Sequence, residues 1–252
     1  MQLLYLRNAT FLLEWNNKKI LVDPMLGSKG SMDPVPNTAN TIRNPTVDLT
    51  LSDIAVQTMV QDIDAVLLTH THRDHWDVAA QQMLPKTTTI ICQPEDVQKI
   101  SEAGFINVIP VQDSITWNHF TIHRTGGQHG TGEIGKLMAP VSGFVITDGE
   151  HRLYIAGDTI WCNEVKETLD RFKPEYTVVN AGAARFLQGD PITMTAADVL
   201  EVINHPAHTN VIAVHMESIN HCTLTREDLA VAVAVASKEC NIPDPGDWIM
   251  LN

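Results

Sequence analysis

Three histidines and an aspartate stand close together in one segment of the chain, which reads HTHRDHWD from His70 to Asp77. In an extended segment alternate side chains share a face, so His70 and His72 can bind one metal ion. Asp74 and His75 follow where the chain begins to turn, so they can face a second ion. Chance explains such a cluster poorly, because an apolar, strand-like run directly precedes it. We interpret the segment as a metal site.

Two bound ions would need about four ligands each, which is more than this segment can supply. A further candidate is His129 in TGGQHGTGEIG, whose glycines let the backbone turn tightly near a site. Asp158 and His215 each follow an apolar run, and α/β proteins place their chemistry where such strands end. Simpler interpretations stay open, namely an exposed loop for His129 and a turn or helix N-cap for Asp158. His221 competes with His215 as a ligand.

The proposed ligands are all imidazole or carboxylate groups, a set that suits Zn, Mn, Fe or Co. Zinc is the expected metal, with manganese or iron as alternatives. Two ions that share a water can lower its pKa from about 16 to about 7, which makes hydroxide available at neutral pH. The sequence therefore predicts a hydrolase that attacks a small ester-like, lactone or phosphoester substrate. In this reaction Asp74 is the catalytic residue that orients the water or handles its proton.

Residues beside the ligands are the candidates for substrate contacts, and they are Thr131, Asn180, Asn220 and His221. His221 is the strongest of them, because it shares a loop with His215. A long segment at about 25–52 contains several Pro, Asn and Thr residues and has little periodicity. Long loops in compact domains are often functional, so we expect this segment to be a lid over the site.

The composition excludes several classes of protein. A formal net charge of −13 argues against a surface that binds nucleic acid, so the expected partner is a small molecule. A homo-oligomer stays open. The four cysteines include no C-x-x-C pair, the first residues do not resemble a signal peptide, and no apolar run is long enough to span a membrane. We expect a cytoplasmic protein without membrane contact.

Strand and helix patterns alternate along the chain and predict one α/β domain over residues 1–252. Strands are expected at 3–6, 11–15, 19–22, 65–69, 88–92, 106–110, 114–117, 119–124, 141–147, 152–156, 176–180, 211–214 and 248–251. Helices are expected at 76–84, 95–103 and 163–172, and after the capping patterns that begin at Thr195 and Thr225. The Val/Ala alternation at 230–236 also fits a strand, but the cap and the alanines favour a helix.

The order of the motifs resembles that of the metallo-β-lactamase superfamily over nearly the whole chain. HTHRDH comes first, then His129, then AGD ending in Asp158, then AVH ending in His215. Within the superfamily the chain looks most similar to the stand-alone bacterial metal-dependent hydrolases that include L-ascorbate phosphate lactonase. The resemblance implies a four-layer αββα sandwich, with two mixed β-sheets face to face, helices outside, and a dinuclear site at one edge.

The resemblance also implies roles for the candidate ligands. One ion would be held by His70, His72 and His129. The other would be held by Asp74, His75 and His215, with Asp158 as the bridge. Asp23 matches a position that supports the site without binding metal, although a simple Asp-Pro turn would also explain it.

Departures from the family pattern narrow the expected activity. Many true β-lactamases of the superfamily are exported and use a cysteine on the second ion, so antibiotic hydrolysis is not expected. The RNA-processing members carry extra domains or basic arms, and neither is visible in this sequence, so nuclease activity is not expected. Two alternatives stay open: a di-iron redox protein, whose relatives normally carry a flavin-binding domain, and a catalytically silent metal-binding protein of the same fold.

Overall fold

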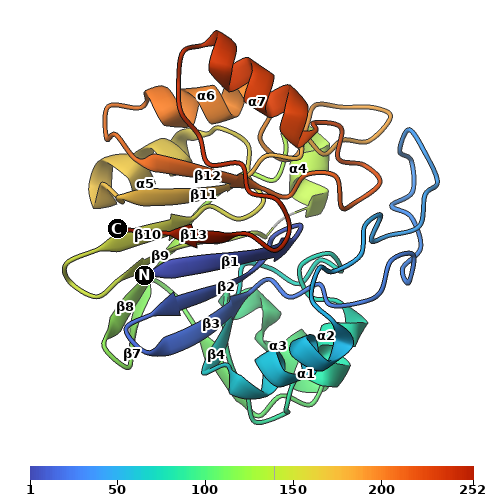
Figure 1. Cartoon of the computed structure of the whole chain (residues 1–252), viewed down its shortest axis with the longest axis vertical. Coiled ribbons are helices and arrows are strands. Elements are labelled where there is room, and N and C mark those ends of the chain that lie inside the picture. The colour runs from blue at the N-terminus through green and yellow to red at the C-terminus, as the bar shows by residue number, and fades with distance from the viewer. Residues whose placement is uncertain (139) are drawn as a thin grey trace.

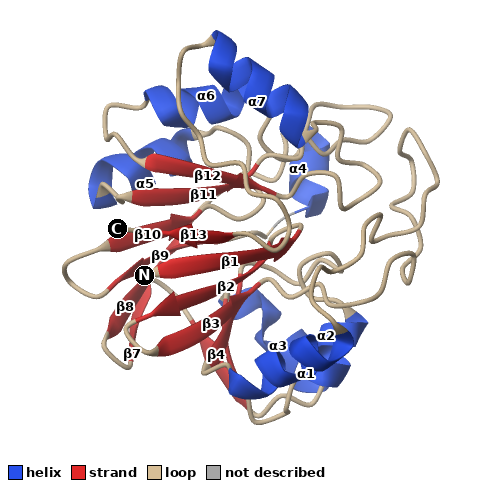
Figure 2. Cartoon of the chain, viewed as in Figure 1, coloured by secondary structure: helices blue, strands red, loops and turns tan. Residues whose placement is uncertain are grey.

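Two β-sheets lie face to face, and helices lie on their outer sides (Figures 1 and 2). The computed structural model describes residues 1–138 and 140–252. Each sheet contains both parallel and antiparallel strand pairs. The predicted αββα sandwich of two mixed sheets is therefore confirmed.

The first sheet has seven strands in the order β13-β1-β2-β3-β4-β5-β6. They are β1 (Gln2–Arg7), β2 (Thr10–Trp15), β3 (Lys18–Val22), β4 (Ala65–Leu68), β5 (Thr89–Cys92), β6 (Asn107–Pro110) and β13 (Trp248–Met250). The second sheet has six strands in the order β12-β11-β10-β9-β8-β7. They are β7 (Ser114–Trp117), β8 (Phe120–Thr125), β9 (Gly143–Thr147), β10 (Arg152–Ile155), β11 (Tyr176–Asn180) and β12 (Asn210–Val214). Every strand expected from the sequence is present.

The helices beside the first sheet are α1 (Asp53–Asp62), α2 (Val78–Met83) and α3 (Val97–Glu102), which follows the 3₁₀ turn η1 (Pro94–Asp96). Those beside the second sheet are α5 (Asn163–Phe172), α6 (Ala196–Asn204) and α7 (Arg226–Val235). The helical interpretation of the Val/Ala segment is confirmed by α7. The single helix expected at 95–103 is wrong in its first turn, which is η1.

Two helices were not expected from the sequence. α1 buries only Val56 and Val60, so its apolar periodicity is weak. α4 (Gly132–Met138) contains two glycines and has no buried residue, and glycine in a helix interior is unfavourable. Both elements therefore depend on their position in the fold more than on their own composition.

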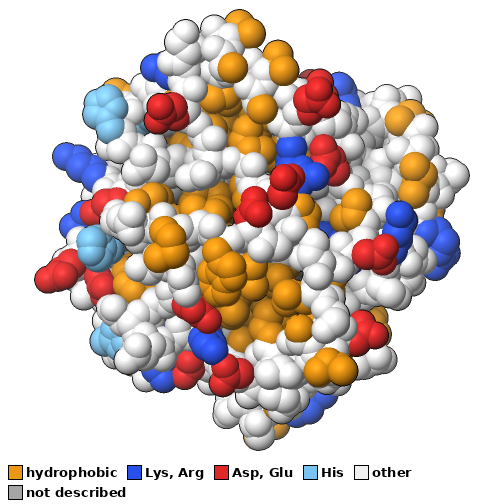
Figure 3. All heavy atoms as spheres, in the orientation of Figure 1, with side chains coloured by type: hydrophobic (Ala, Val, Ile, Leu, Met, Phe, Trp, Pro, Cys, Tyr) orange, Lys and Arg blue, Asp and Glu red, His pale blue; other side chains and the backbone are white. Residues whose placement is uncertain are grey.

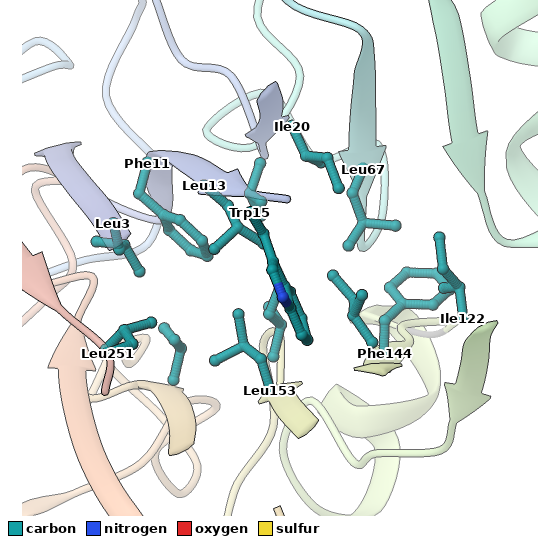
Figure 4. Packing of buried hydrophobic residues seen from close by; sticks show 14 of the residues in the cluster. Leu3, Phe11, Leu13, Trp15, Ile20, Leu67, Ile122, Phe144, Leu153 and Leu251 are labelled. Atoms are coloured by element: carbon teal, nitrogen blue, oxygen red, sulfur yellow. The ribbon is translucent and has the colours of Figure 1, made fainter. Parts of the chain in front are cut away.

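The main core lies between the two sheets. Leu3, Leu13 and Leu67 of the first sheet face Phe144 and Leu153 of the second, and all five are fully buried (Figure 4). Side chains alternate along each strand, so the next residues point to the outer faces, where the helices cover them. Since both faces of most strands are buried, the strand ends are held in fixed positions relative to one another.

The segment at 25–52 follows β3 and lies on the same side of the sandwich as α4 (Figure 1, right). The fully buried Arg7 of β1 binds its base by donating hydrogen bonds to the carbonyls of Met25, Gly27 and Val47 at 2.6, 2.8 and 3.0 Å. The base of this segment is therefore fixed to the first sheet. Whether it acts as a lid stays a prediction.

The surface over β1, β2 and β13 gathers hydrophobic side chains on the face shown in Figure 3. Trp248 and Met250 of the edge strand β13 are exposed. None of the helices in residues 1–138 and 140–252 is both long enough and apolar enough to cross a membrane.

Candidate metal centre

The ends of four strands meet at one edge of the sandwich and carry the predicted ligands. β3 and β4 of the first sheet lead into Asp23 and His70, and β10 and β12 of the second sheet lead into Asp158 and His215. The segment after β4 turns at once, since the N–H groups of His75 and Trp76 both donate to the carbonyl of His72 at 2.9 Å. Strand ends from both sheets and this turn therefore bring together residues that are far apart in the sequence.

Seven side chains form two groups of potential ligands, within each of which the ligand atoms lie within 4.8 Å of one another. One group is His70, His72 and His129, and the other is Asp74, His75, Asp158 and His215. These are the seven ligands predicted from the sequence. The donors are imidazole nitrogens and carboxylate oxygens, which fit a divalent transition-metal ion.

Asp158 lies between the two groups. Its Oδ2 atom is 3.2 Å from Nε2 of His75, 3.4 Å from Nε2 of His129 and 3.9 Å from Nε2 of His70. Its Oδ1 atom accepts a hydrogen bond from the amide of Asn180 at 2.6 Å. This position suits the predicted bridging role, because one carboxylate oxygen reaches ligand atoms of both groups.

Asp23 orients two of the histidines. Its carboxylate lies 2.9 Å from Nδ1 of His75 and accepts hydrogen bonds from the backbone N–H and the hydroxyl of Thr69, both at 2.7 Å. The Thr69 hydroxyl in turn lies 3.0 Å from Nδ1 of His70. With both Nδ1 atoms engaged, Nε2 of each ring is left to face the centre. Carboxylates commonly orient metal-binding histidines in this way.

Other contacts position the remaining side chains, and the sequence did not indicate them. Nδ1 of His129 donates to the carbonyl of Ile192 at 2.7 Å, and Nδ1 of His215 lies 3.6 Å from the thiol of Cys222. The buried Asn8, between β1 and β2, accepts from the backbone N–H of His215 and donates to the backbone carbonyl of Asp74. Ile192 and Asn8 lie far from these ligands in the sequence, and Cys222 lies in the same loop as His215 but in no motif, so no sequence pattern indicated these contacts.

Burial lowers the pKa of all three histidines in the first group, because a buried imidazolium loses its hydration. For His70 the nearby rings of His75 and His72 lower the pKa further. These rings are therefore neutral near pH 7, which is the form that binds a metal ion.

In the second group the attraction between opposite charges outweighs the effect of burial on the pKa values. Burial opposes charge on every member, but the carboxylates around His75, led by Asp158, raise its pKa to about 10, and Asp158 raises the pKa of His215 well above its usual value. In the same way the imidazoles hold the pKa of Asp74 and of Asp158 well below the usual range. A cation that binds these carboxylates would take the place of the imidazolium protons.

A pocket of about 470 Å³ opens over the two groups. Its polar lining is His72, Arg73, Asp74, His129, Asp158 and His221, and its apolar lining is Pro34, Val35, Pro36, Met138, Phe186 and Ile192. The ligands lie at one side of a space whose walls are mostly apolar. Pro34, Val35 and Pro36 belong to the segment at 25–52 that was expected over the site, whereas Arg73, Met138, Phe186 and Ile192 were not predicted, since no sequence motif marks them.

The four predicted substrate contacts lie in different places. His221 lines the pocket, and its buried Nδ1 atom has no hydrogen-bond partner among the described residues. The other three are not among the described lining residues. Asn180 is bound to Asp158, and the hydroxyl of Thr131 donates to Asp190 at 2.9 Å.

Asn220 lies in the network that holds the segment at 25–52. Its side chain accepts from the backbone N–H of Val35 at 2.9 Å and from the amide of Asn44 at 2.8 Å. It donates to the hydroxyl of Thr38 at 2.7 Å and to the carbonyl of Asn40 at 3.1 Å. Asn220 therefore supports the pocket wall at 34–36 from behind.

The chain is similar to known proteins over most of its length. The Beta-lactamase superfamily domain matches residues 18–216. The UPF0173 protein YddR of Bacillus subtilis (strain 168) is 36% identical over 233 residues, which cover 91% of each chain. The crystal structure of an isothiocyanate hydrolase from Delia radicum gut bacteria is 39% identical, with a TM-score of 0.93 over 100% of this chain and 99% of that one. A possible metal-dependent hydrolase from Veillonella parvula DSM 2008 is 32% identical, with a TM-score of 0.94 and the same coverage.

Proposed function

The chain belongs to the family of the Beta-lactamase superfamily domain and is a metal-dependent hydrolase, and from this premise we propose that it hydrolyses a small, uncharged substrate at an electrophilic carbon. Isothiocyanates are the first class to test, ahead of lactones and esters. The observation that carries the proposal is the apolar wall of the pocket over the His/Asp cluster. The similarity to an isothiocyanate hydrolase supports the same substrate class.

The pocket lining favours carbon over phosphorus as the centre of attack. Apolar walls stabilise an apolar substituent by removing it from water. A phosphoester would bring charged oxygens into the pocket, and among the described lining residues Arg73 is the only lysine or arginine that could pair with them. We therefore place phosphoesters last among the substrates predicted from the sequence.

The two ligand groups fit two divalent ions, and we propose zinc first, with manganese or iron as alternatives. Ions bound there would supply a hydroxide nucleophile near neutral pH and polarise the substrate. The buried contacts of Asp23, the Ile192 carbonyl and Asn180 hold the ligand side chains in place before any substrate arrives. Such preorganisation lowers the cost of reaching the transition state.

Asp74 is the acid that we expect to move protons. Both Asp74 and Asp158 line the pocket, but the side chain of Asp74 is 14% exposed, whereas that of Asp158 is 4% exposed and is bound to Asn180. In the proposed reaction the water oxygen bonds to the central carbon of R–N=C=S, both water protons move to nitrogen, and the C–N bond breaks. The products are a primary amine and carbonyl sulfide. His221 lines the same pocket, and we expect its ring to hydrogen-bond the sulfur or nitrogen of the substrate.

Steady-state kinetics on four substrate classes tests this proposal. The panel is benzyl isothiocyanate, an aliphatic lactone, a p-nitrophenyl ester and a p-nitrophenyl phosphodiester, with the metal-loaded protein and its His72→Ala variant run side by side. We expect the isothiocyanate to have the highest kcat/KM and the variant to lose that activity. A phosphodiester that is hydrolysed faster, or an isothiocyanate rate equal in both proteins, would overturn the proposal.

A further inference from the structure

A second pocket, also of about 470 Å³, adjoins the one over the ligands. Met138 and Phe186 line both pockets, so these two side chains form a shared wall. The other lining residues of the second pocket are Asn37, Ile134, Leu137, Leu187 and Gln188. The second pocket therefore forms a compartment beside the space over the cluster, along α4.

The second compartment is uncharged and largely apolar. None of the described residues that line it carries a charge. Two of its apolar side chains are left largely in water, since Leu137 is 77% exposed and Leu187 is 70% exposed. Apolar side chains that gather around a concave surface, and not singly, commonly mark a binding site.

Two glycines allow close packing around α4. Gly189 has a φ of +96°, and a Cβ atom there would lie 2.3 Å from Cδ1 of Ile134 on α4. A Cβ atom on Gly135 of α4 would lie 2.5 Å from the carbonyl oxygen of Gly130. The loop at Gly189 therefore lies directly against Ile134 of α4, which lines the compartment, and Gly135 lets the start of α4 pack against Gly130.

We propose that this second compartment, lined by α4 and residues 186–188, binds an uncharged hydrocarbon arm of the substrate while the reactive carbon lies at the His/Asp cluster. The inference rests on the proposed function and extends it. It assigns the substrate an alkyl or aryl arm that reaches beyond Met138 and Phe186 into the second compartment. A substrate with a charged or strongly polar arm would lose hydration there without gaining a partner.

Inert analogues separate this inference from turnover. The probes are N-alkylthioureas with arms from methyl to octyl, which keep the N–C=S group of an isothiocyanate but lack its cumulated electrophilic carbon. Calorimetric titration of the metal-loaded protein gives their Kd values. We expect the affinity to rise about fourfold per added methylene, which corresponds to ~0.8 kcal/mol, until the compartment is filled. In protein labelled with ¹³C-methyl methionine, the longer arms should shift the NMR signal of the Met138 methyl group. The Met138→Leu variant identifies that signal, because the variant lacks it.

A double variant, Leu137→Gln with Leu187→Gln, removes apolar surface from the compartment at two exposed positions, so folding should be preserved. We expect it to flatten the dependence of affinity on arm length. The matched control is Ile54→Gln with Val235→Gln, which changes two side chains of 80% and 82% exposure on α1 and α7. The control should keep the wild-type dependence.

Each result decides the inference independently of catalysis. The inference is overturned if the affinity of the wild type does not rise with arm length, or if the Leu137/Leu187 variant shows the same rise as the wild type. A third outcome combines two results: the wild-type affinity does not change with arm length, and the Leu137/Leu187 variant has a changed sedimentation coefficient. The surface then contacts a second copy of the chain, which also overturns the inference. Because thioureas are not hydrolysed, a rising dependence supports the subsite even if no isothiocyanate is turned over, and that result would count against the proposed function alone.

Discussion

The pocket lies over the seven candidate ligands, here called the floor, and beside an apolar wall, which is the segment 34–36 together with Met138, Phe186 and Ile192. The floor and the wall are held in different ways. The floor lies at strand ends and in the turn after β4, and buried partners such as Asp23 fix its side chains through hydrogen bonds. The wall comes from loops and α4, and its side chains make mainly apolar contacts.

This difference suggests that the floor determines the reaction and that the wall determines which substrate binds. Hydrogen bonds are directional, and a buried polar group without a partner is costly, so the floor tolerates few arrangements. Apolar contacts have no such direction, so the wall can change shape while the fold persists. We therefore expect changes in the floor to affect metal binding and kcat, and changes in the wall to affect KM and substrate preference.

The largest effect should come from the floor at Asp158. Asp158→Ala removes the carboxylate that reaches both ligand groups, and we expect kcat/KM to fall by at least ~10³-fold with loss of bound metal. Kinetics and elemental analysis measure the two effects. Asp190→Asn, at an exposed position, is the control. An Asp158→Ala protein with full metal content and activity would contradict the expectation that the floor determines metal binding and kcat.

A smaller effect is expected at Asp23, which supports the floor without belonging to it. Asp23→Asn keeps the size of the side chain but cannot accept from Thr69 and His75 in the same way, so metal affinity should fall by about 10- to 100-fold. Competition with a chromophoric chelator measures that affinity. Asp33→Asn changes an exposed aspartate and should leave it unchanged. Equal affinities in the two variants would show that Asp23 does not orient the histidines.

The support behind the wall can be tested at Asn220. Asn220→Ala removes the side-chain hydrogen bonds to Val35, Thr38, Asn40 and Asn44, so the free energy of unfolding should fall by about 2–4 kcal/mol. We also expect KM to rise more than kcat falls, since the ligands stay in place.

Denaturant unfolding and steady-state kinetics on the same preparation measure both effects of Asn220→Ala. Asn107→Ala is the control, because its exposed side chain makes one hydrogen bond to the carbonyl of Thr87. If kcat fell while KM stayed constant, a change behind the wall would act on the floor, and the two would not be independent.

The smallest effect is expected at the wall itself. Phe186→Ala removes apolar surface from a half-buried side chain, and KM for substrates with a bulky apolar arm should rise roughly tenfold. The smallest isothiocyanate should be affected less. Phe172→Ala, a half-buried phenylalanine that lies outside the pocket lining, serves as the comparison. A uniform change for all arm sizes would show that Phe186 does not select the substrate.

Much of the floor could be predicted, because each ligand follows a recognisable local pattern. His70, His72, Asp74 and His75 form one contiguous motif, and the other three ligands follow glycine-rich or apolar runs. The substrate contacts were harder to predict. Among the four candidates only His221 is a described lining residue, since proximity in sequence to a ligand does not determine which way a loop side chain points.

The sequence by itself determined the class of fold and which residues could bind a metal ion, because strand periodicity and a contiguous His/Asp motif are local properties of the chain. Only the tertiary structure decided what holds and surrounds that site. Asn8 and Phe186 reach it from distant loops, Cys222 contacts His215 from the loop that follows β12, and α4 contributes Met138 to its wall despite two glycines. Such contacts depend on how two sheets pack and where their loops cross, and no short window of sequence contains that information.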